Sequence, residues 1–450
     1  MKSIFIYPLF RKSLVTLSWT ILLMAGIAQA NTIIVTSTAD SGAGTLRNAL
    51  ASAANGDTID ATGVAGTILL TSGELLVSSS VKIVGPGAAN LGVDMSTPNN
   101  VFHVAPGQTV AISGLTITQG STGIFNDQGN VTVTGCVINS NANGGIQNDG
   151  GTLTVNGCVI SGNQTGLGGG GIANFGYAGT STAAVANCII SNNVAQNVSG
   201  DTFGGGIYND GTGGSASLSI SNCTIVGNMA NPNNVNVFSG NACGGGVANY
   251  ASNGVATVTI ANSTISGNSI DAINGTALKA LGGGIYNGGT GVMTVSGATI
   301  SNNSASNDYG PGEQTAAGGG GIYNNGSDGG ATTMTVTNST VTGNQVEAGN
   351  FGRSHGGGIF NDGSNGRADL TVGNSDVNTN STVSDILDTG GGIKNSVDES
   401  DLGDGGYADV TLNNCQLIGN SVSKQYGSAI DNQSIFGPLA TMDLINCTVN

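Results

Sequence analysis

The 450-residue sequence is poor in charged and aromatic side chains, which make up 8% and 4% of it, and it has ten Lys and Arg residues against 26 Asp and Glu. A formal net charge of −16 repels polyanions, so we expect no nucleic acid partner and no anionic lipid. With two histidines in the chain, the residue type most used for general acid–base catalysis is also scarce.

Long hydrophobic runs are missing after residue 30. Before that point, a basic start is followed by an apolar run over residues 14–27 and by the small-x-small motif of residues 28–30. This pattern predicts a secretory signal peptide over residues 1–30, with an uncleaved membrane anchor as the alternative. We therefore expect a secreted, extracellular or bacterial cell-surface protein with no transmembrane span after the signal peptide.

The sequence is rich in glycine, with 78 residues, and the glycines belong to a phrase that recurs from about residue 114 to the end. Each copy has a Gly-rich corner, Ile-x-Asn, an alternating Leu/Val/Thr segment and then a small residue before Thr-Ile-Ser-Gly-Asn. The small residues are Cys136, Cys158, Cys188, Cys223, Ser263, Ala298, Ser339, Ser375, Cys415 and Cys447. The corner asparagines are Asn126, Asn148, Asn174, Asn209, Asn249, Asn287, Asn324, Asn361, Asn395 and Asn432. A period of about 22 to 41 residues predicts a solenoid with one coil per copy.

Within each copy, apolar and polar residues alternate over runs too short for helices, and glycine or asparagine interrupts every run. The pattern predicts an all-β fold, a single right-handed parallel β-helix with three short strands per coil, the architecture called pectin lyase-like. Equivalent residues would stack about 4.8 Å apart, which puts the asparagines in hydrogen-bonded ladders and the isoleucines in the core.

Six of the seven cysteines occupy the small inward position, where other copies carry serine or alanine. This exchange favours a ladder of buried thiols, because neighbours in a parallel stack seldom have disulfide geometry. Disulfides remain the alternative in a secreted chain. Cys243 lies in a loop and is expected to be free or intermolecular.

Residues 31–113 differ from the repeats and are expected to form an N-terminal cap and the first coils. Residues 32–36 predict a strand, and residues 45–56 a short amphipathic helix with Thr45 as N-cap and Gly56 as the stop. The repeats of residues 114–450 end inside a coil. We therefore expect either further sequence or an oligomeric partner to cover that last, incomplete coil.

Residues 44–49 (Gly-Thr-Leu-Arg-Asn-Ala) resemble the Cys-Ser-Leu-Arg-Glu-Ala motif of a group of bacterial secreted right-handed parallel β-helix proteins, and they keep Leu46, Arg47 and Ala49. The Gly-Gly-Gly-Ile segments (204–207, 282–285, 319–322 and 356–359) and the Ile-x-x-Asn segments resemble polymorphic outer-membrane-protein repeats, although that family usually has Phe where Ile stands here. The resemblance implies a secreted or surface location and often an adhesive role.

The segment between Ile-x-x-Asn and the next Gly-rich corner varies most, from about two residues after Asn141 to about fifteen after Asn228. Because every coil inserts at the same corner, these loops are expected to form a ridge along one edge. Phe351 and Arg353 on this ridge are candidate ligand-binding residues. Beside it, Tyr286, Tyr323 and Phe360 form an aromatic stripe that either binds sugar rings or packs under the loops. The candidate partners are a carbohydrate or a protein of a host or neighbouring surface.

Acidic residues gather on two adjacent coils near the C-terminus. Asp369 and Asp409 are expected side by side on neighbouring strands, and Asp398, Asp401 and Asp404 lie in the turn between these coils. These five residues are the candidate ligands for calcium, the one cofactor considered, and a solvated acidic turn is the alternative.

No arrangement of residues in the sequence identifies a catalytic nucleophile or base, so we assign no catalytic residue. We expect an adhesive, binding or structural display role through the loop ridge. The alternative is a carbohydrate-active enzyme, a polysaccharide lyase or glycoside hydrolase, in which Asp369 and Asp409 would act as the carboxylate pair.

Overall fold

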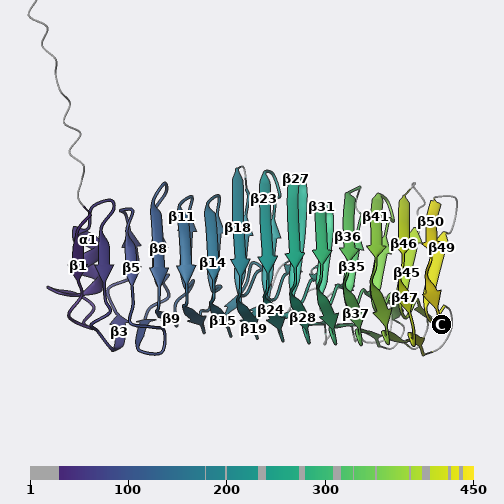
Figure 1. Ribbon diagram of the computed structural model, residues 1–450, viewed down its shortest axis with the longest axis horizontal. Helices are drawn as coiled ribbons and strands as arrows, with labels where there is room; N and C mark the ends of the chain where they lie inside the picture. The colour runs from purple at the N-terminus through teal and green to yellow at the C-terminus, as the bar shows by residue number, and fades with distance from the viewer. Residues whose placement is uncertain are drawn as a thin grey trace, which may run out of the picture.

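The computed structural model describes residues 30–450 except 178, 198–199, 232–239, 273–278, 308–315, 328, 350–351, 385–386, 398–405, 424–426 and 435–438. The predicted signal peptide therefore lies almost wholly outside the described residues. The rest is a right-handed parallel β-helix, as predicted, whose coils stack along the long axis from the N-terminal to the C-terminal end (Figure 1). Within the described ranges, no helix is long and apolar enough to cross a membrane.

Each regular coil contributes a first strand at Ile-x-Asn, a second at the alternating segment and a third at Thr-Ile-Ser. First and second strands belong to one 24-stranded sheet of the described residues, because β27 and β31 run through both positions. The strands of the cap and first coils in this sheet are β1 (Thr32–Ile34), β2 (Thr58–Asp60), β4 (Leu75–Val77), β5 (Lys82–Val84), β7 (Phe102–Val104) and β8 (Thr109–Ser113). The first strands of the repeats are β10 (Ile124–Asp127), β13 (Ile146–Asp149), β17 (Ile172–Phe175), β22 (Ile207–Asp210), β27 (Val247–Ala261), β31 (Ile285–Ser296), β35 (Ile322–Asn325), β40 (Ile359–Asp362), β45 (Ile393–Val397) and β49 (Ile430–Ser434). The second strands are β11 (Asn130–Thr134), β14 (Thr152–Asn156), β18 (Thr180–Ala186), β23 (Ser215–Ser221), β36 (Ala331–Thr337), β41 (Arg367–Gly373), β46 (Tyr407–Asn413) and β50 (Leu439–Ile445).

The third strands form a separate parallel sheet that closes the coil. Its members are β3 (Gly66–Leu70), β6 (Leu91–Met95), β9 (Thr116–Thr118), β12 (Val137–Asn139), β15 (Val159–Ser161), β19 (Ile189–Ser191), β24 (Thr224–Val226), β28 (Thr264–Ser266), β32 (Thr299–Ser301), β37 (Thr340–Thr342), β42 (Asp376–Asn378), β47 (Gln416–Leu417) and β51 (Thr448–Val449).

The alternation of the sequence matches the side chains that are buried. In β23, Ala216, Leu218 and Ile220 point inward and are buried, while the serines between them face solvent. At the end of that strand Cys223 is buried, and its Sγ accepts from the backbone N–H of Cys188 at 3.5 Å. No cysteine pair is joined by a disulfide, so the predicted thiol ladder is confirmed for the described coils.

Two asparagine ladders hold the corners in register, and both are buried. At the first corner each side-chain amide donates to the next, as from Asn209 to Asn249 at 2.8 Å. At the second, Asn228 Nδ2 donates to Asn268 Oδ1 at 2.9 Å, and the Asn228 backbone N–H donates to the same oxygen at 3.0 Å. The predicted ladders are thus present, and they satisfy amide groups that would otherwise be buried without partners.

The N-terminal cap contains α1 (Leu46–Ser52), which begins at the predicted N-cap, Thr45. The helix ends earlier than predicted, with Ala53 as C-cap in an extended conformation rather than at Gly56. Arg47 points away from the core and pairs with Asp40 at 2.7 Å. Burial opposes ionisation of Asp40, but hydrogen bonds from Ser72, Arg47 and Thr71 outweigh it and hold the pKa of this carboxyl well below its usual range.

Where the sequence predicts only loops, the structure has two further parallel sheets. After the third strand lie β16 (Gln164–Thr165), β20 (Val194–Ala195), β25 (Met229–Ala230), β29 (Ser269–Asp271), β33 (Ser304–Asn307), β38 (Gln345–Ala348), β43 (Ser381–Ser384) and β48 (Ser421–Val422). Before the next Gly-rich corner lie β21 (Thr202–Phe203), β26 (Ala242–Cys243), β30 (Lys279–Leu281), β34 (Ala316–Gly318), β39 (Arg353–His355) and β44 (Leu387–Thr389). We call these the outgoing and the returning sheet of the loop ridge.

Candidate functional site

The loop ridge rises from a regular base. In the outgoing sheet Ile270 pairs with Ala305 and Ala305 with Val346, and in the returning sheet Ala280 pairs with Ala317. These side chains meet in a small apolar core of their own, separate from the core of the coils. Small residues suit this place because the two sheets have to approach each other closely. The inserted segments therefore leave the β-helix along one edge, with their bases in register.

Two cationic side chains lie at the base of the ridge: the candidate ligand-binding residue Arg353 and its neighbour in the same sheet, Lys279. Lys279 begins β30 and Arg353 begins β39, and both pair with Ala316, which lies on the strand between them. Both side chains are partly exposed. Phe351, the other ridge residue predicted to bind a ligand, lies outside the described residues.

The predicted aromatic stripe exists but is not at the surface. Tyr286, Tyr323 and Phe360 are aligned on β31, β35 and β40, with ring centroids 6.0 Å apart for the first pair and 4.8 Å for the second. They are only 3%, 2% and 2% exposed. The expectation of an outward-facing stripe is wrong in this respect, because the returning sheet of the ridge covers the rings, with Leu281 packed among them.

The buried rings have polar partners beneath the ridge. Tyr323 donates its hydroxyl hydrogen to Asp362 at 2.6 Å, and Asn325 donates to the hydroxyl oxygen of Tyr286 at 2.9 Å. Desolvation raises the pKa of Tyr286 well above its usual value. The aromatic row therefore acts as a packed layer between coil and ridge, which is the packing alternative that the sequence left open.

The same row ends in a buried cation that sequence reasoning missed. Lys394 follows Phe360 in register, its side chain is 1% exposed, and its ammonium group contacts Asp431 and Gln433 on the next coil. The sequence does contain a sign of this buried cation. Lys394 stands at the position where neighbouring copies have an aromatic residue, and a charge at that position needs a partner.

The two acidic residues predicted side by side are in register, Asp369 on β41 and Asp409 on β46. Arg367 lies between their carboxylates, with its Nε 2.8 Å from Asp369 and an Nη 3.3 Å from Asp409. A guanidinium group thus offsets the repulsion between these two carboxylates, and calcium binding by them stays a prediction. Asp398, Asp401 and Asp404 lie outside the described residues. Among the residues that are described, no three His, Cys, Asp or Glu side chains gather closely enough to hold a metal ion.

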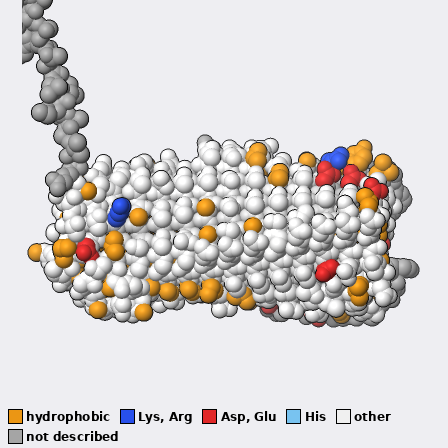
Figure 2. All heavy atoms as spheres, viewed as in Figure 1, with side chains coloured by type: hydrophobic (Ala, Val, Ile, Leu, Met, Phe, Trp, Pro, Cys, Tyr) orange, Lys and Arg blue, Asp and Glu red, His pale blue; other side chains and the backbone are white. Residues whose placement is uncertain are grey.

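The space-filling view shows the same distribution of charge. Acidic and basic side chains appear near the two ends of the visible face, and the long middle of that face is almost free of them (Figure 2). Each of the two histidines has a polar contact: His355 is buried with its Nδ1 2.7 Å from Thr389, and the Nδ1 of His103 lies 2.8 Å from Glu74.

Neither a protein-family model nor a curated protein matches the chain. Solved structures with a similar fold include ORF18 of Geobacillus virus E2, at 12% identity and a TM-score of 0.42, over 71% of this chain and 57% of that one. The catalytic unit of a thermostable GH87 α-1,3-glucanase from Streptomyces thermodiastaticus is 16% identical with a TM-score of 0.44, over 90% of this chain and 70% of that one. The pectate lyase Pel9A is 14% identical with a TM-score of 0.38, over 78% and 79% of the two chains. The chain thus spans little more than half of the viral protein's length, and what it shares with these structures is the parallel β-helix scaffold.

Proposed function

We propose that this chain is a secreted or cell-surface β-helix protein that binds a partner through its loop ridge. The observation that carries the proposal is the ridge base, two ordered sheets closed by an apolar core. Loops whose position has no role would not need such an ordered base. A rigid base instead presents the inserted segments in fixed order, one every coil, or about every 4.8 Å.

The chemistry of the ridge base suits the binding of polar or acidic groups. Lys279 and Arg353 stand two coils apart, roughly 10 Å along one row. In a chain of net charge −16, such a pair attracts acidic or hydroxyl-rich groups locally. A carbohydrate chain or a protein on a host or neighbouring surface could contact both cations at once, and this geometry supports an adhesive or display role.

The test is pull-down and size-exclusion chromatography of residues 31–450 with neutral and acidic polysaccharides, comparing the chain with the double variant Lys279→Ala/Arg353→Ala. Lys82→Ala, which removes an exposed lysine of β5, is the matched control. We expect at least ten-fold weaker retention on one polymer for the double variant and no change for the control. Equal retention of all three proteins would refute the ridge as the binding surface. Shortening of the polymer would instead establish the alternative, a carbohydrate-active enzyme.

A further inference from the structure

One coil of the repeat has a shorter turn than its neighbours between the first and second strands. The corner asparagine Asn249 donates to the carbonyl of Ala256, seven residues on, but Asn287 donates to that of Gly291, only four residues on. The pairing of β27 with β31 shows the same difference, because the register shifts between Ala251 and Ala256. The coil after it is long again. The turns between the first and second strands of successive coils stack on one another, and this stack therefore lacks one layer at residues 288–290.

The short turn is tied to its longer neighbour by a side chain. Thr290 donates its hydroxyl hydrogen to the carbonyl of Gly254 at 2.7 Å. The equivalent carbonyls of other coils, those of Gly214 and Gly330, accept from backbone N–H groups at 2.9 Å. At Gly289 the φ is +67°, and a Cβ there would lie 1.9 Å from the Ala251 carbonyl oxygen, so the chain passes too close for any side chain. The floor of the gap is thus backbone, fixed in place.

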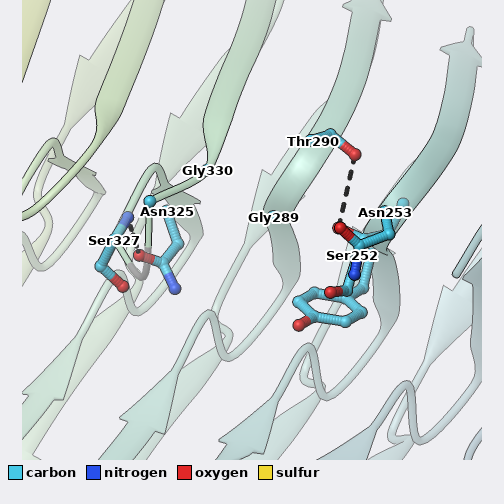
Figure 3. A pocket seen from close by; sticks show the side chains of 10 residues that line it. Ser252, Asn253, Gly289, Thr290, Asn325, Ser327 and Gly330 are labelled. Atoms are coloured by element: carbon cyan, nitrogen blue, oxygen red, sulfur yellow. Dashed lines mark hydrogen bonds between the residues drawn. The ribbon is translucent and has the colours of Figure 1, made fainter.

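The missing layer leaves a cavity of about 160 Å³, which we call the turn slot. Ser252 and Asn253 line one wall, Asn325 and Ser327 the other, and Gly289 with Thr290 forms the floor (Figure 3). The slot is open to solvent. A layer one coil thick is about 4.8 Å, which admits a single ring and excludes a folded chain.

The described walls of the turn slot offer hydrogen-bonding groups. Neither a carboxylate nor a cation is among its described lining residues. The side chains of Ser252, Asn253 and Ser327 make no hydrogen bond with other described residues, so two hydroxyls and one carboxamide are available to a ligand. Tyr250 contributes an aromatic surface to the lining, and its ring is stacked on Phe203 with centroids 5.1 Å apart.

We propose that the turn slot binds one uncharged sugar residue. Hydroxyl and carboxamide groups on facing walls match the alternating hydroxyls of a pyranose ring, and the tyrosine provides contact for its C–H face. A cavity of about 160 Å³ holds a small cluster of water, which the ligand replaces, and its thickness of one layer suits one ring. A sugar acid is disfavoured because nothing in the described lining neutralises a carboxylate. This site is separate from the loop ridge, and the inference does not depend on the function proposed for the ridge.

The experiment is saturation-transfer difference NMR with glucose, galactose, mannose and N-acetylglucosamine, and with glucuronic acid as the charged comparison. Two variants close the slot. Ser327→Trp fills it with a side chain, and a turn graft replaces residues 288–290 by the six-residue sequence of residues 250–255. Ser217→Trp, at an exposed serine of β23, is the matched control.

We expect at least one neutral sugar to show saturation transfer that falls at least ten-fold in both closing variants and persists in Ser217→Trp. If circular dichroism shows that the grafted variant does not fold, Ser327→Trp alone provides the test. The proposal is overturned if no neutral sugar gives a signal, if the signal survives Ser327→Trp, or if glucuronic acid gives an equal signal that Ser327→Trp removes. Lys279→Ala/Arg353→Ala should leave the signal unchanged, which separates this site from the ridge.

Discussion

Removal of one rung of the second asparagine ladder should destabilise the chain far more than a single polar residue usually does. Asn268 is buried, and its Oδ1 accepts both the backbone N–H and the Nδ2 of Asn228. Its own Nδ2 donates to the carbonyl of Ile225 and to Asn303 Oδ1, both at 3.0 Å. Asn268→Ala therefore deletes four hydrogen bonds in a place that water does not reach.

The magnitude follows from the groups left without partners. The backbone N–H of Asn228 and one of its Nδ2 hydrogens lose their acceptor, and each buried donor costs about 1–3 kcal/mol. Asn303 Oδ1 is less affected, because the backbone N–H of residue 268 still donates to it. We expect Asn268→Ala to lower the free energy of unfolding by about 4 kcal/mol, the sum for two orphaned donors.

The assay is guanidinium unfolding followed by circular dichroism, together with hydrogen exchange at the Asn228 amide, which should lose protection in the variant. Asn130→Ala is the control, because Asn130 is exposed on β11, and we expect it to change stability by less than about 0.5 kcal/mol. A loss below about 1 kcal/mol with unchanged protection at Asn228 would show that the ladder does not hold the corners, and would refute the reasoning.

Three further predictions concern charge and thiols. Arg367→Gln should lower the free energy of unfolding by less than about 1 kcal/mol, because solvent screens this half-exposed ion pair, and isothermal titration calorimetry should show stronger calcium binding once the cation between the two carboxylates is gone. Because folding lowers the pKa of Asp40, its contribution to stability is present above the unfolded pKa of about 3.9 and is lost as pH falls further. Asp40→Asn should therefore lower the Tm at pH 7, and the difference in Tm between the two proteins should shrink as the pH falls below about 4. The hydrogen bond with Cys158 is the main reason that the pKa of Cys188 is raised to about 11, so roughly 0.1% of it is thiolate at pH 8. Iodoacetamide followed by mass spectrometry should label the less buried Cys447 first, and equal labelling of the two would contradict the buried ladder.

The fold was predictable because its determinants are repeated. The inward aliphatic residues, the corner asparagines and the small residue before the third strand recur from copy to copy, so an error in one copy is corrected by the others. The cap helix was predictable from Thr45 and the spacing of Leu46, Ala49 and Leu50, and only its last turn was misplaced. What the family resemblance added, a CSLREA-type identity and a surface location, stays a prediction.

The sites were harder to predict because they depend on which segments of the chain cover which side chains. Tyr286 has the same sequence context whether it faces solvent or lies under β30, and no local pattern shows that the returning segment forms a strand over it. The pairing of Arg367 with Asp369 and Asp409 depends on side-chain reach between two coils. Lys394 likewise required knowledge that Asp431 stands one coil further on. Each case is a contact between copies that differ, and the repeat alone does not describe such contacts.

The two proposed binding surfaces have a common physical origin. The ladders and the core fix the length of every strand, because a shift of one residue would turn a buried asparagine or isoleucine outward. Changes in chain length are therefore tolerated only at the corners, where added residues build outward and missing residues leave a gap. Additions after the second ladder gave the loop ridge its two sheets, and the deletion beside Asn287 opened the turn slot. In this fold, departures from the repeat length at the corners are thus the places to search for binding sites, since the stacked strands leave little freedom elsewhere.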